Sequence, residues 1–289
     1  MLKRKLFHLS NRILSPLQIK LIRDHSAQPR TDQKIFFMHL GKCAGTSLFE
    51  AMRQAMNVGW EGLIDTQEPI YRVKSIHNTN NLEVLLPRFH ELRINLALHR
   101  MAQGDQLVTG HIPYCKSAFD QYRDQYSFVT VMRDPVERVI STYKYSKARG
   151  QVFRESENDF LSAEDELQFF LNSTRGDFEV NNYVAFFGGL HTTQSYQNNV
   201  EQAKQNVKDF HLIGFTENLA EFANQFDQMF GLELDIPSLR VTKQVFKEKS
   251  PSEAGEEIDK LFTPKVRQQI AELCQADYEV YNYALQVFG

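Results

Sequence analysis

Cysteine is scarce in this chain, which contains three such residues among 289. Cys43, Cys115 and Cys274 lie far apart, and the sequence contains neither a CxxC pair nor a cluster of cysteine and histidine. Structural zinc sites need such ligands at short spacings, so we expect no metal site and no metal in the chemistry. A small, odd number of cysteines also indicates a reducing compartment rather than a framework of disulfides.

The chain also lacks an excess of charge of either sign. Its formal net charge is −3 and its pI is about 6.3. A general nucleic-acid-binding protein would be markedly basic, so we expect no nucleic-acid partner. A site for an anionic ligand must therefore be built from local groups rather than from the overall field of the protein.

No long uninterrupted apolar run is present, and this holds in particular for the basic N-terminal segment 1–34. Its apolar residues are separated by charges every few positions, so it contains neither the apolar core of a signal peptide nor a membrane span. A solvated helix is the simpler interpretation, and a peripheral contact with a membrane surface or an anionic polymer is the alternative. The basic side chains concerned are Lys3, Arg4, Lys5, Arg12, Lys20 and Arg23.

What the chain does have is an alternation of short apolar strands with helical patterns. We predict strands at 35–40, 106–109, 127–132 and 211–215, and helices at 46–57, 82–102, 136–148, 160–173, 196–208, 217–230 and 263–286. This alternation predicts one α/β domain over 35–289, a three-layer sandwich with a central parallel sheet flanked by helices. The stretch 57–104 mixes a polar loop with a helical pattern and is ambiguous.

A first candidate site is the sequence HLGKCAGTS at 39–47, between the first predicted strand and its helix. Main-chain N–H groups at the start of a helix bind anions, and glycines let the backbone approach a phosphate closely. Lys42 adds a positive charge, and Thr46 and Ser47 add hydroxyl donors. The spacing differs from the nucleotide triphosphatase pattern GxxxxGK[ST], because the lysine here precedes the glycine turn.

Structural explanations compete for the same segment. Ser47 and Glu50 match a capping box, in which the two side chains satisfy main-chain N–H groups at the helix start. Cys43 would be either a small residue that fills the turn or a reactive thiol. Taken alone, the segment therefore leaves phosphate binding and helix capping open.

A second candidate site follows the strand at 127–132. Arg133 stands at the C-terminal end of this strand, the edge at which parallel α/β sheets bind ligands, and Ser141 offers a hydroxyl further along the next helix. An arginine fork together with a hydroxyl suits a phosphate monoester. The residues between them have the types expected at a helix start, namely Asp134 as N-cap, Pro135 at the first helical position and Glu137. Arg138 would either anchor this helix or join the phosphate site.

Together, the two motifs resemble those of the sulfotransferases that use 3′-phosphoadenosine-5′-phosphosulfate (PAPS). The similarity is greatest to the carbohydrate branch that includes heparan sulfate 2-O-sulfotransferase, and it extends over roughly 35–285. The resemblance implies a P-loop-like form of the three-layer sandwich and PAPS as the cosubstrate. It also implies a hydroxyl-bearing acceptor, preferably a saccharide or a glycolipid.

In that family the first motif holds the 5′-phosphosulfate and the second holds the 3′-phosphate. The positions that match the first motif are Lys42, Gly45, Thr46 and Ser47, and those that match the second are Arg133 and Ser141. The chain departs from the usual first motif at Gly41, Cys43 and Ala44, where proline, threonine and glycine are usual. Cys43 removes a hydroxyl donor, and Ala44 lowers the conformational freedom of the loop.

His111 is the expected general base. It follows a predicted strand end and a glycine, and the GHIP sequence at 110–113 resembles a short family segment whose histidine takes the acceptor proton. A neutral imidazole with a pKa of about 6.5 suits this proton transfer. Lys42 would act with it by stabilising the charge that grows on the leaving 5′-phosphate oxygen. The weaker candidates are His39, expected to pack against or orient the loop, His77 and His99.

Tyrosines beside the two motifs bear on the nature of the acceptor. Tyr114, Tyr143 and Tyr145 lie close to the proposed site in the sequence. An aromatic face would suit a sugar ring, although tyrosines at such spacings are also common in protein cores.

Two other functions are alternatives. A P-loop kinase would share the strand–loop–helix unit but should show GK[ST] and a magnesium-binding aspartate at a strand end. A non-catalytic protein that binds nucleotides or glycans is the second alternative. Because Golgi sulfotransferases carry an N-terminal anchor and 1–34 has no apolar run, we expect an enzyme of the bacterial cytoplasm.

Overall fold

The computed structural model describes residues 31–64, 67–79, 81–148, 162–189, 199–236 and 258–289. Most of the basic segment 1–34 therefore lies outside the described residues, and its contact with a membrane stays a prediction. Within the described part of the chain, no helix combines the length and the apolar character needed to cross a membrane.

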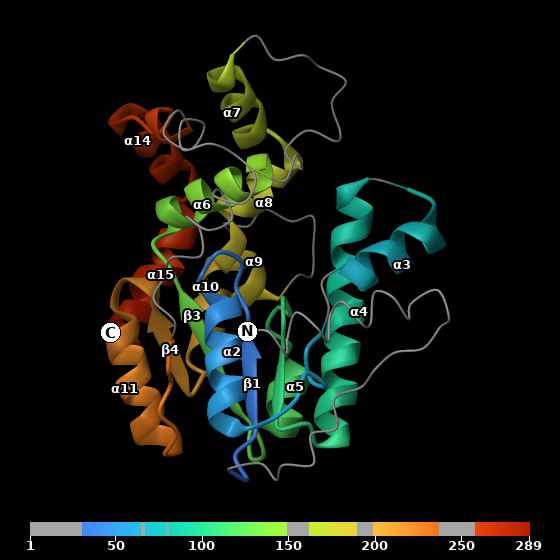
Figure 1. The fold of residues 1–289 in the computed structure, drawn as a ribbon. Helices are drawn as coiled ribbons and strands as arrows, with labels where there is room; N and C mark the ends of the chain where they lie inside the picture. The colour runs from blue at the N-terminus through green and yellow to red at the C-terminus, as the bar shows by residue number, and fades with distance from the viewer. Residues whose placement is uncertain (1–30, 65–66, 80, 149–161, 190–198, 237–257) are drawn as a thin grey trace, which may run out of the picture.

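The centre of the described fold is a parallel sheet of four strands: β1 (Ile35–Met38), β2 (Leu107–Gly110), β3 (Ser127–Met132) and β4 (Leu212–Phe215). The strands lie in the order β2-β1-β3-β4 (Figure 1). Met38 of β1 is opposite Gly110 of β2 and Thr130 of β3. The chain therefore leaves these three strands at one edge of the sheet, where ligands bind in such folds.

Helices follow the strands as expected for repeated βα units. α2 (Gly45–Met56) follows β1, α6 (Pro135–Ala148) follows β3, and a 3₁₀ turn, η3 (Thr216–Asn218), leads from β4 into α11 (Leu219–Phe230). The other described helices are α3 (Gln67–His77), α4 (Leu82–Gln103), α5 (Lys116–Tyr122), α7 (Ala163–Leu171), α8 (Thr174–Val180), α9 (Asn182–Gly188), α10 (Val200–Val207), α14 (Pro264–Leu273) and α15 (Gln275–Phe288).

These helices cover both faces of the sheet. Phe37 and Val129 pack with α2 and α11 on one face. Phe36 and Phe128 pack with α5, α10 and α15 on the other face. Burial on both faces explains why the strands are almost continuously apolar. The predicted three-layer α/β sandwich with its parallel sheet is confirmed (Figure 1).

The predicted strands are confirmed with small shifts at their ends, whereas two predicted helices are wrong in length. The helix predicted at 263–286 is divided into α14 and α15, which meet at Cys274. The helix predicted at 160–173 ends early, because the Ser173 hydroxyl accepts a hydrogen bond from the Gly176 N–H (3.0 Å) and begins α8. Helices α3, α5, α8 and α9 have no counterpart among the predicted elements.

Candidate active site

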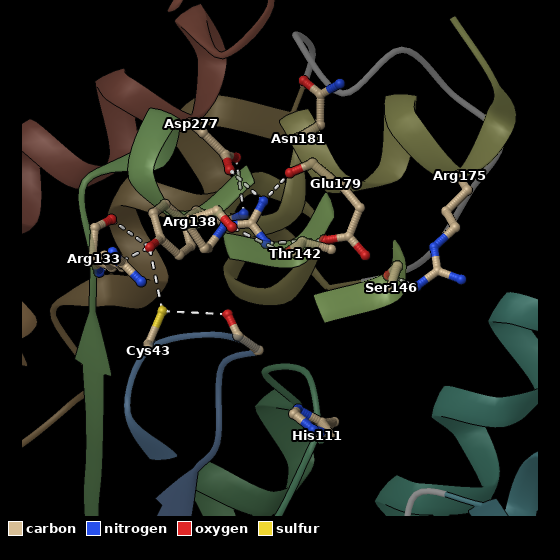
Figure 2. Close-up of polar contacts among 12 residues, drawn as sticks. Cys43, His111, Arg133, Arg138, Thr142, Ser146, Arg175, Glu179, Asn181 and Asp277 are labelled. Carbon is tan, nitrogen blue, oxygen red and sulfur yellow. Dashed lines mark hydrogen bonds and ion pairs between the residues drawn. The ribbon is translucent and has the colours of Figure 1, made fainter. Parts of the chain in front are cut away.

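The segments singled out in the sequence meet at the C-terminal edge of the sheet. The segment 39–47 follows β1, His111 follows β2 and Arg133 follows β3, and Figure 2 shows the last two on either side of the first loop. The ring centroids of His39 and His111 lie 4.4 Å apart. A Cβ placed on Gly41 would lie 4.0 Å from Cε1 of His111. The strand order thus brings the predicted loop, base and arginine together.

The first loop is bent by two residues with a left-handed backbone conformation. Lys42 and Ala44 have φ values of 65° and 58°, in the left-handed region. Ala44 is the N-cap of α2 and makes no side-chain capping bond, while its carbonyl accepts from the Ser47 N–H (3.0 Å). Within the described residues, no acceptor bonds the N–H groups of Gly45 and Thr46. Unbonded donors at a helix N-terminus fit the 5′-phosphosulfate predicted here.

The capping box considered as an alternative is wrong. Ser47 lies inside the first turn of α2, because the N-cap is Ala44. Glu50 instead accepts a hydrogen bond from Arg53 Nη2 (2.8 Å). In the part of the chain that the structure describes, the hydroxyls of Thr46 and Ser47 bond to no other group. Both hydroxyls therefore remain available to a ligand.

Gly45 is required by close packing against His39. A Cβ at this position would lie 1.9 Å from Cδ2 of the His39 ring, which is far inside van der Waals contact. Burial, with His111 and Lys42 nearby, holds the pKa of His39 well below its usual value, so this ring is neutral at pH 7. The need for glycine here is therefore steric, and it holds whether or not a phosphate is bound.

The side chain of Lys42 lies against α6. Its Nζ is 3.9 Å from the ring centroid of Tyr145, a cation–π distance. The contact places a positive charge between the first loop and the helix that carries Ser141. Lys42 therefore lies between the first loop and α6, the helix that follows the second motif.

The aromatic face suggested for a sugar is wrong for two of its three tyrosines. Tyr114 and Tyr143 are buried in the core, with 6% and 0% of their surface exposed. The Tyr114 hydroxyl donates to Asp209 Oδ2 (2.6 Å). These two rings therefore pack the interior instead of offering an open surface to an acceptor.

The cysteines are free thiols in this structure. Burial raises the pKa of Cys43 to about 11, so the thiol keeps its proton and packs in the turn. This favours the turn-filling role over a reactive thiol, since the thiolate is the nucleophile. Among the described residues, no group of three or more histidine, cysteine, aspartate or glutamate side chains could hold a metal ion.

His111 is held in a single orientation. Its Nδ1 lies 2.6 Å from the carbonyl oxygen of His39, and a carbonyl can only accept, so Nδ1 carries the proton. Nε2 is then the unprotonated nitrogen. Burial, and to a lesser extent Arg93, lowers the pKa of His111 to about 4, whereas the His39 carbonyl and Glu179 oppose the shift. The imidazole is therefore neutral at pH 7 and able to accept a proton.

Arg133 and Ser141, the residues predicted to hold the 3′-phosphate, lie before and within α6. Arg133 has 30% of its side chain exposed, and its Nη2 lies 3.7 Å from Glu137 Oε2. Ser141 is buried on α6, further along the helix that begins after Arg133. Asp134 is confirmed as the N-cap, because its Oδ1 accepts from the Glu137 N–H (3.0 Å). This cap fixes the start of α6 and with it the place of Arg133.

Arg138 is an anchor of the core. Its side chain is 1% exposed, and its Nη1 lies 3.0 Å from Glu179 Oε2. Its Nη2 lies 4.0 Å from Asp277 Oδ2 (Figure 2). The guanidinium carbon lies 5.4 Å from the ring centroid of Tyr183. Of the two roles considered for Arg138, the structure favours the anchor, because its charge is used inside the protein.

Two residues of this site had no signal in the sequence. Tyr183 of α9 is fully buried, and its hydroxyl contacts both the Arg133 main chain and Cys43. Arg93 of α4 is buried and lowers the pKa values of His111 and His90. Arg93 lies in the ambiguous stretch 57–104, and Tyr183 lies in a stretch that carries no recognisable motif, so neither could be singled out.

The weaker histidine candidates lie apart from this arrangement. His77 ends α3, and His99 is an exposed residue of α4. No contact joins either of them to the first loop within the described part of the chain. His111 is thus the candidate base that the fold brings to the loop.

Comparison with known proteins agrees with the geometry. No curated protein matches this chain. A model of the sulfotransferase family matches residues 29–284, a span that includes the first loop, His111 and Arg133. Because this match covers most of the chain, the protein belongs to the sulfotransferase family and uses PAPS as its sulfuryl donor.

Proposed function

We propose that this sulfotransferase transfers the sulfuryl group of PAPS to a hydroxyl of a carbohydrate, with His111 as the general base. The observation that carries the proposal is the contact of His111 Nδ1 with the His39 carbonyl (2.6 Å). It leaves Nε2 free to accept a proton beside the loop that follows β1. Neither alternative function, the P-loop kinase or the non-catalytic binding protein, is favoured by any contact in the site.

The two motifs would hold opposite ends of the cosubstrate. Lys42, Gly45, Thr46 and Ser47 would surround the 5′-phosphosulfate, with Lys42 as the charged group and the others as main-chain and hydroxyl donors. Arg133 and Ser141 would hold the 3′-phosphate. The unbonded N–H groups of the loop and the partly exposed Arg133 support this assignment.

The reaction would be an in-line displacement at sulfur. The acceptor oxygen forms a bond to sulfur as its proton passes to Nε2 of His111, and the bond from sulfur to the 5′-phosphate oxygen breaks. The products are a sulfate ester and 3′,5′-adenosine diphosphate (3′,5′-ADP). Lys42 and the loop N–H groups would stabilise the negative charge on the leaving oxygen, because they are already oriented before the reaction.

His111 is unprotonated, as a general base must be, but its pKa lies below the value of about 6.5 expected from the sequence, so its imidazole is a weaker base than a solvated one. With a pKa of about 4 the imidazole is unprotonated in the free enzyme at neutral pH. The base is therefore ready without a prior deprotonation step. Glu179 opposes the lowering of this pKa, so it also favours the imidazolium that forms when the acceptor proton is taken up.

The carbohydrate acceptor rests on the resemblance of the two motifs and the 110–113 segment to the carbohydrate branch. A panel of acceptors tests it: an acidic polysaccharide, a glycolipid, a small alcohol and a tyrosine peptide, with release of 3′,5′-ADP from PAPS as the signal. We expect the saccharides to be the acceptors. Turnover with the peptide alone would contradict the carbohydrate assignment while leaving the sulfotransferase activity intact. The cytoplasmic location stays a prediction.

The proposed base is tested by His111→Gln, which removes the ionisable nitrogen and keeps a polar side chain. We expect kcat to fall about 10²- to 10⁴-fold, the usual contribution of general base catalysis, with the dissociation constant for 3′,5′-ADP within about twofold of the wild type. His99→Gln is the matched control, since His99 is exposed on α4. A kcat for His111→Gln within threefold of that of the control would rule out the base.

A further inference from the structure

One buried hydroxyl joins the two halves of the cosubstrate site. We propose that Tyr183 is a positioning residue for PAPS, whose hydroxyl holds the Arg133 main chain in register with the first loop. The proposal rests on the assignment of the loop and Arg133 to the two ends of PAPS. Tyr183 of α9 would contact neither end of PAPS, and it would act through Arg133 and the first loop.

The contacts of the Tyr183 hydroxyl define this role. It accepts a hydrogen bond from the Arg133 N–H (2.9 Å) and donates one to the Arg133 carbonyl (2.5 Å). Cys43 Sγ lies 3.5 Å from the same oxygen. The tyrosine proton is directed to the Arg133 carbonyl, and the single thiol proton is shared between the Tyr183 hydroxyl and the Gly41 carbonyl, which also lies 3.5 Å from Sγ. The hydroxyl thus ties the arginine of one motif to the turn of the other.

A tie of this kind is needed because the sheet does not reach these residues. The last register pair of β1 and β3 is Met38 with Thr130. Cys43 and Arg133 both lie beyond this pair, where the ladder of main-chain bonds no longer fixes their separation. PAPS has a fixed distance between its 5′-phosphosulfate and its 3′-phosphate, so the first loop and Arg133 must be held at a matching distance. Tyr183 supplies the link between the loops that the sheet does not.

Tyr183 is itself held rigidly from three helices. Its N–H and that of Val184 donate to Asp277 Oδ1 of α15 (2.8 and 3.0 Å). Its ring lies against the Arg138 guanidinium of α6 (5.4 Å), which is paired with Glu179 of α8 (3.0 Å). Figure 2 shows Arg138, Glu179 and Asp277 gathered beside Arg133 and above Cys43. Because the Tyr183 ring is held in place by these contacts, its hydroxyl can fix the position of the Arg133 main chain.

The test is Tyr183→Phe, which removes the hydroxyl and keeps the ring. The matched control is Tyr126→Phe. Tyr126 is also buried, and its hydroxyl also bonds to main-chain carbonyls, those of Asp105 (2.7 Å) and Met101 (3.3 Å). It lies directly before β3, at the opposite edge of the sheet from the site. Both variants lose a buried hydroxyl, and only one of these lies between the two motifs.

Isothermal titration with 3′,5′-ADP measures the effect. We expect the dissociation constant to rise about 3- to 10-fold in Tyr183→Phe, the range of one hydrogen bond, and to stay within twofold of the wild type in Tyr126→Phe. Both variants should unfold at a lower temperature than the wild type. Equal dissociation constants for the two variants would overturn the proposal, because a purely structural hydroxyl lowers stability without this selectivity.

Cys43→Ala provides a second route if Tyr183→Phe fails to fold. Loss of the thiol removes the other end of the link, so we expect a rise of about twofold in the dissociation constant for 3′,5′-ADP. In the double variant the two effects should be less than additive, since both act on one link. Full additivity would contradict the proposal, and so would an unchanged affinity of Cys43→Ala where that variant is the only one to fold.

Arg133→Gln separates this proposal from the site on which it rests. If Arg133→Gln weakens 3′,5′-ADP binding and Tyr183→Phe does not, the site stands and the positioning role is overturned. If Arg133→Gln leaves binding unchanged, the assignment of the second motif fails and the role of Tyr183 fails with it.

Discussion

At the scale of the residue, Ala44 has an unusual backbone conformation for an alanine. It has a φ of 58°, a conformation that costs an L-residue about 1–2 kcal/mol and glycine almost nothing. The first motif of the sulfotransferases usually has glycine at this position. The alanine therefore stores strain in the loop that would bind the phosphosulfate.

We predict that Ala44→Gly stabilises the protein by roughly 0.5–1 kcal/mol, because the relief of strain exceeds the added entropy of the unfolded chain. Urea unfolding measures the change. Ala55→Gly is the matched control with the opposite sign, since Ala55 lies inside α2, where glycine costs about 1 kcal/mol. Destabilisation of similar size by both substitutions would show that Ala44 does not have the left-handed conformation.

The sequence identified several site residues at this scale but did not settle their roles. Lys42, His111 and Arg133 could be singled out because each follows a strand end, and parallel strands bring such positions together. The capping box failed because the N-cap is decided by the backbone conformation of Ala44, which has no side-chain signature. The role of Arg138 depends on Glu179 and Asp277, which are distant in the sequence and lie beside it only in the folded protein.

At the scale of the element, strands and long helices could be predicted and short buried helices could not. β3 is an apolar run that ends just before Arg133, and the structure has it at the predicted bounds. In α9, by contrast, every residue from Asn182 to Phe187 is buried. A helix buried on all sides has no polar face, so no period of 3.6 residues appears in its sequence.

For the same reason, the sequence does not reveal α9, the helix that carries Tyr183. α9 has 7 residues and lies in a stretch without a recognisable motif, yet it carries Tyr183 between the two motifs. Helix breaks were also missed, because Ser173 and Cys274 interrupt patterns that otherwise continue. The fold class could thus be predicted from the sequence, while the packing around the site had to come from tertiary contacts.

At the scale of the whole molecule, buried histidines make stability depend on pH. Burial lowers the pKa of His90 to about 3 and that of His111 to about 4, and it holds that of His39 well below its usual value. Below a pH of about 6.5 the unfolded chain takes up protons at these positions and the folded chain does not. Their contribution to stability is therefore complete above pH 6.5 and is lost as the pH falls toward 4 and 3.

Asp277 acts in the opposite direction. Burial raises its pKa to about 7, against the influence of Arg138 and of main-chain donors. Between about pH 4 and 7 the folded chain therefore holds a proton that the unfolded chain has lost. This opposes the effect of the histidines, and the raised pKa values of Asp105 and Asp177 act in the same direction as that of Asp277. The lowered pKa of His211 acts with the other histidines.

We predict that the free energy of unfolding falls as the pH is lowered from 7 to 5, because the buried histidines take up protons only in the unfolded chain. Urea unfolding at pH 8, 7, 6 and 5 measures it. His90→Phe removes one of these sites and should lower the slope by about 1.4 kcal/mol per pH unit. A stability that stays constant from pH 7 to 5, or a slope unchanged in His90→Phe, would show that these histidines are not buried in their neutral form.

The central claim is that the loop after β1 and the arginine after β3 bind the two ends of PAPS. The most direct test compares the dissociation constants of 3′,5′-ADP and AMP, which differ only in the 3′-phosphate, in the wild type and in Arg133→Gln. Arg53→Gln of α2 serves as the control. We expect the preference for 3′,5′-ADP to fall about 10- to 100-fold in Arg133→Gln, the range of a charge-assisted hydrogen bond, with AMP binding and the control unchanged. An unchanged preference in Arg133→Gln would contradict the account.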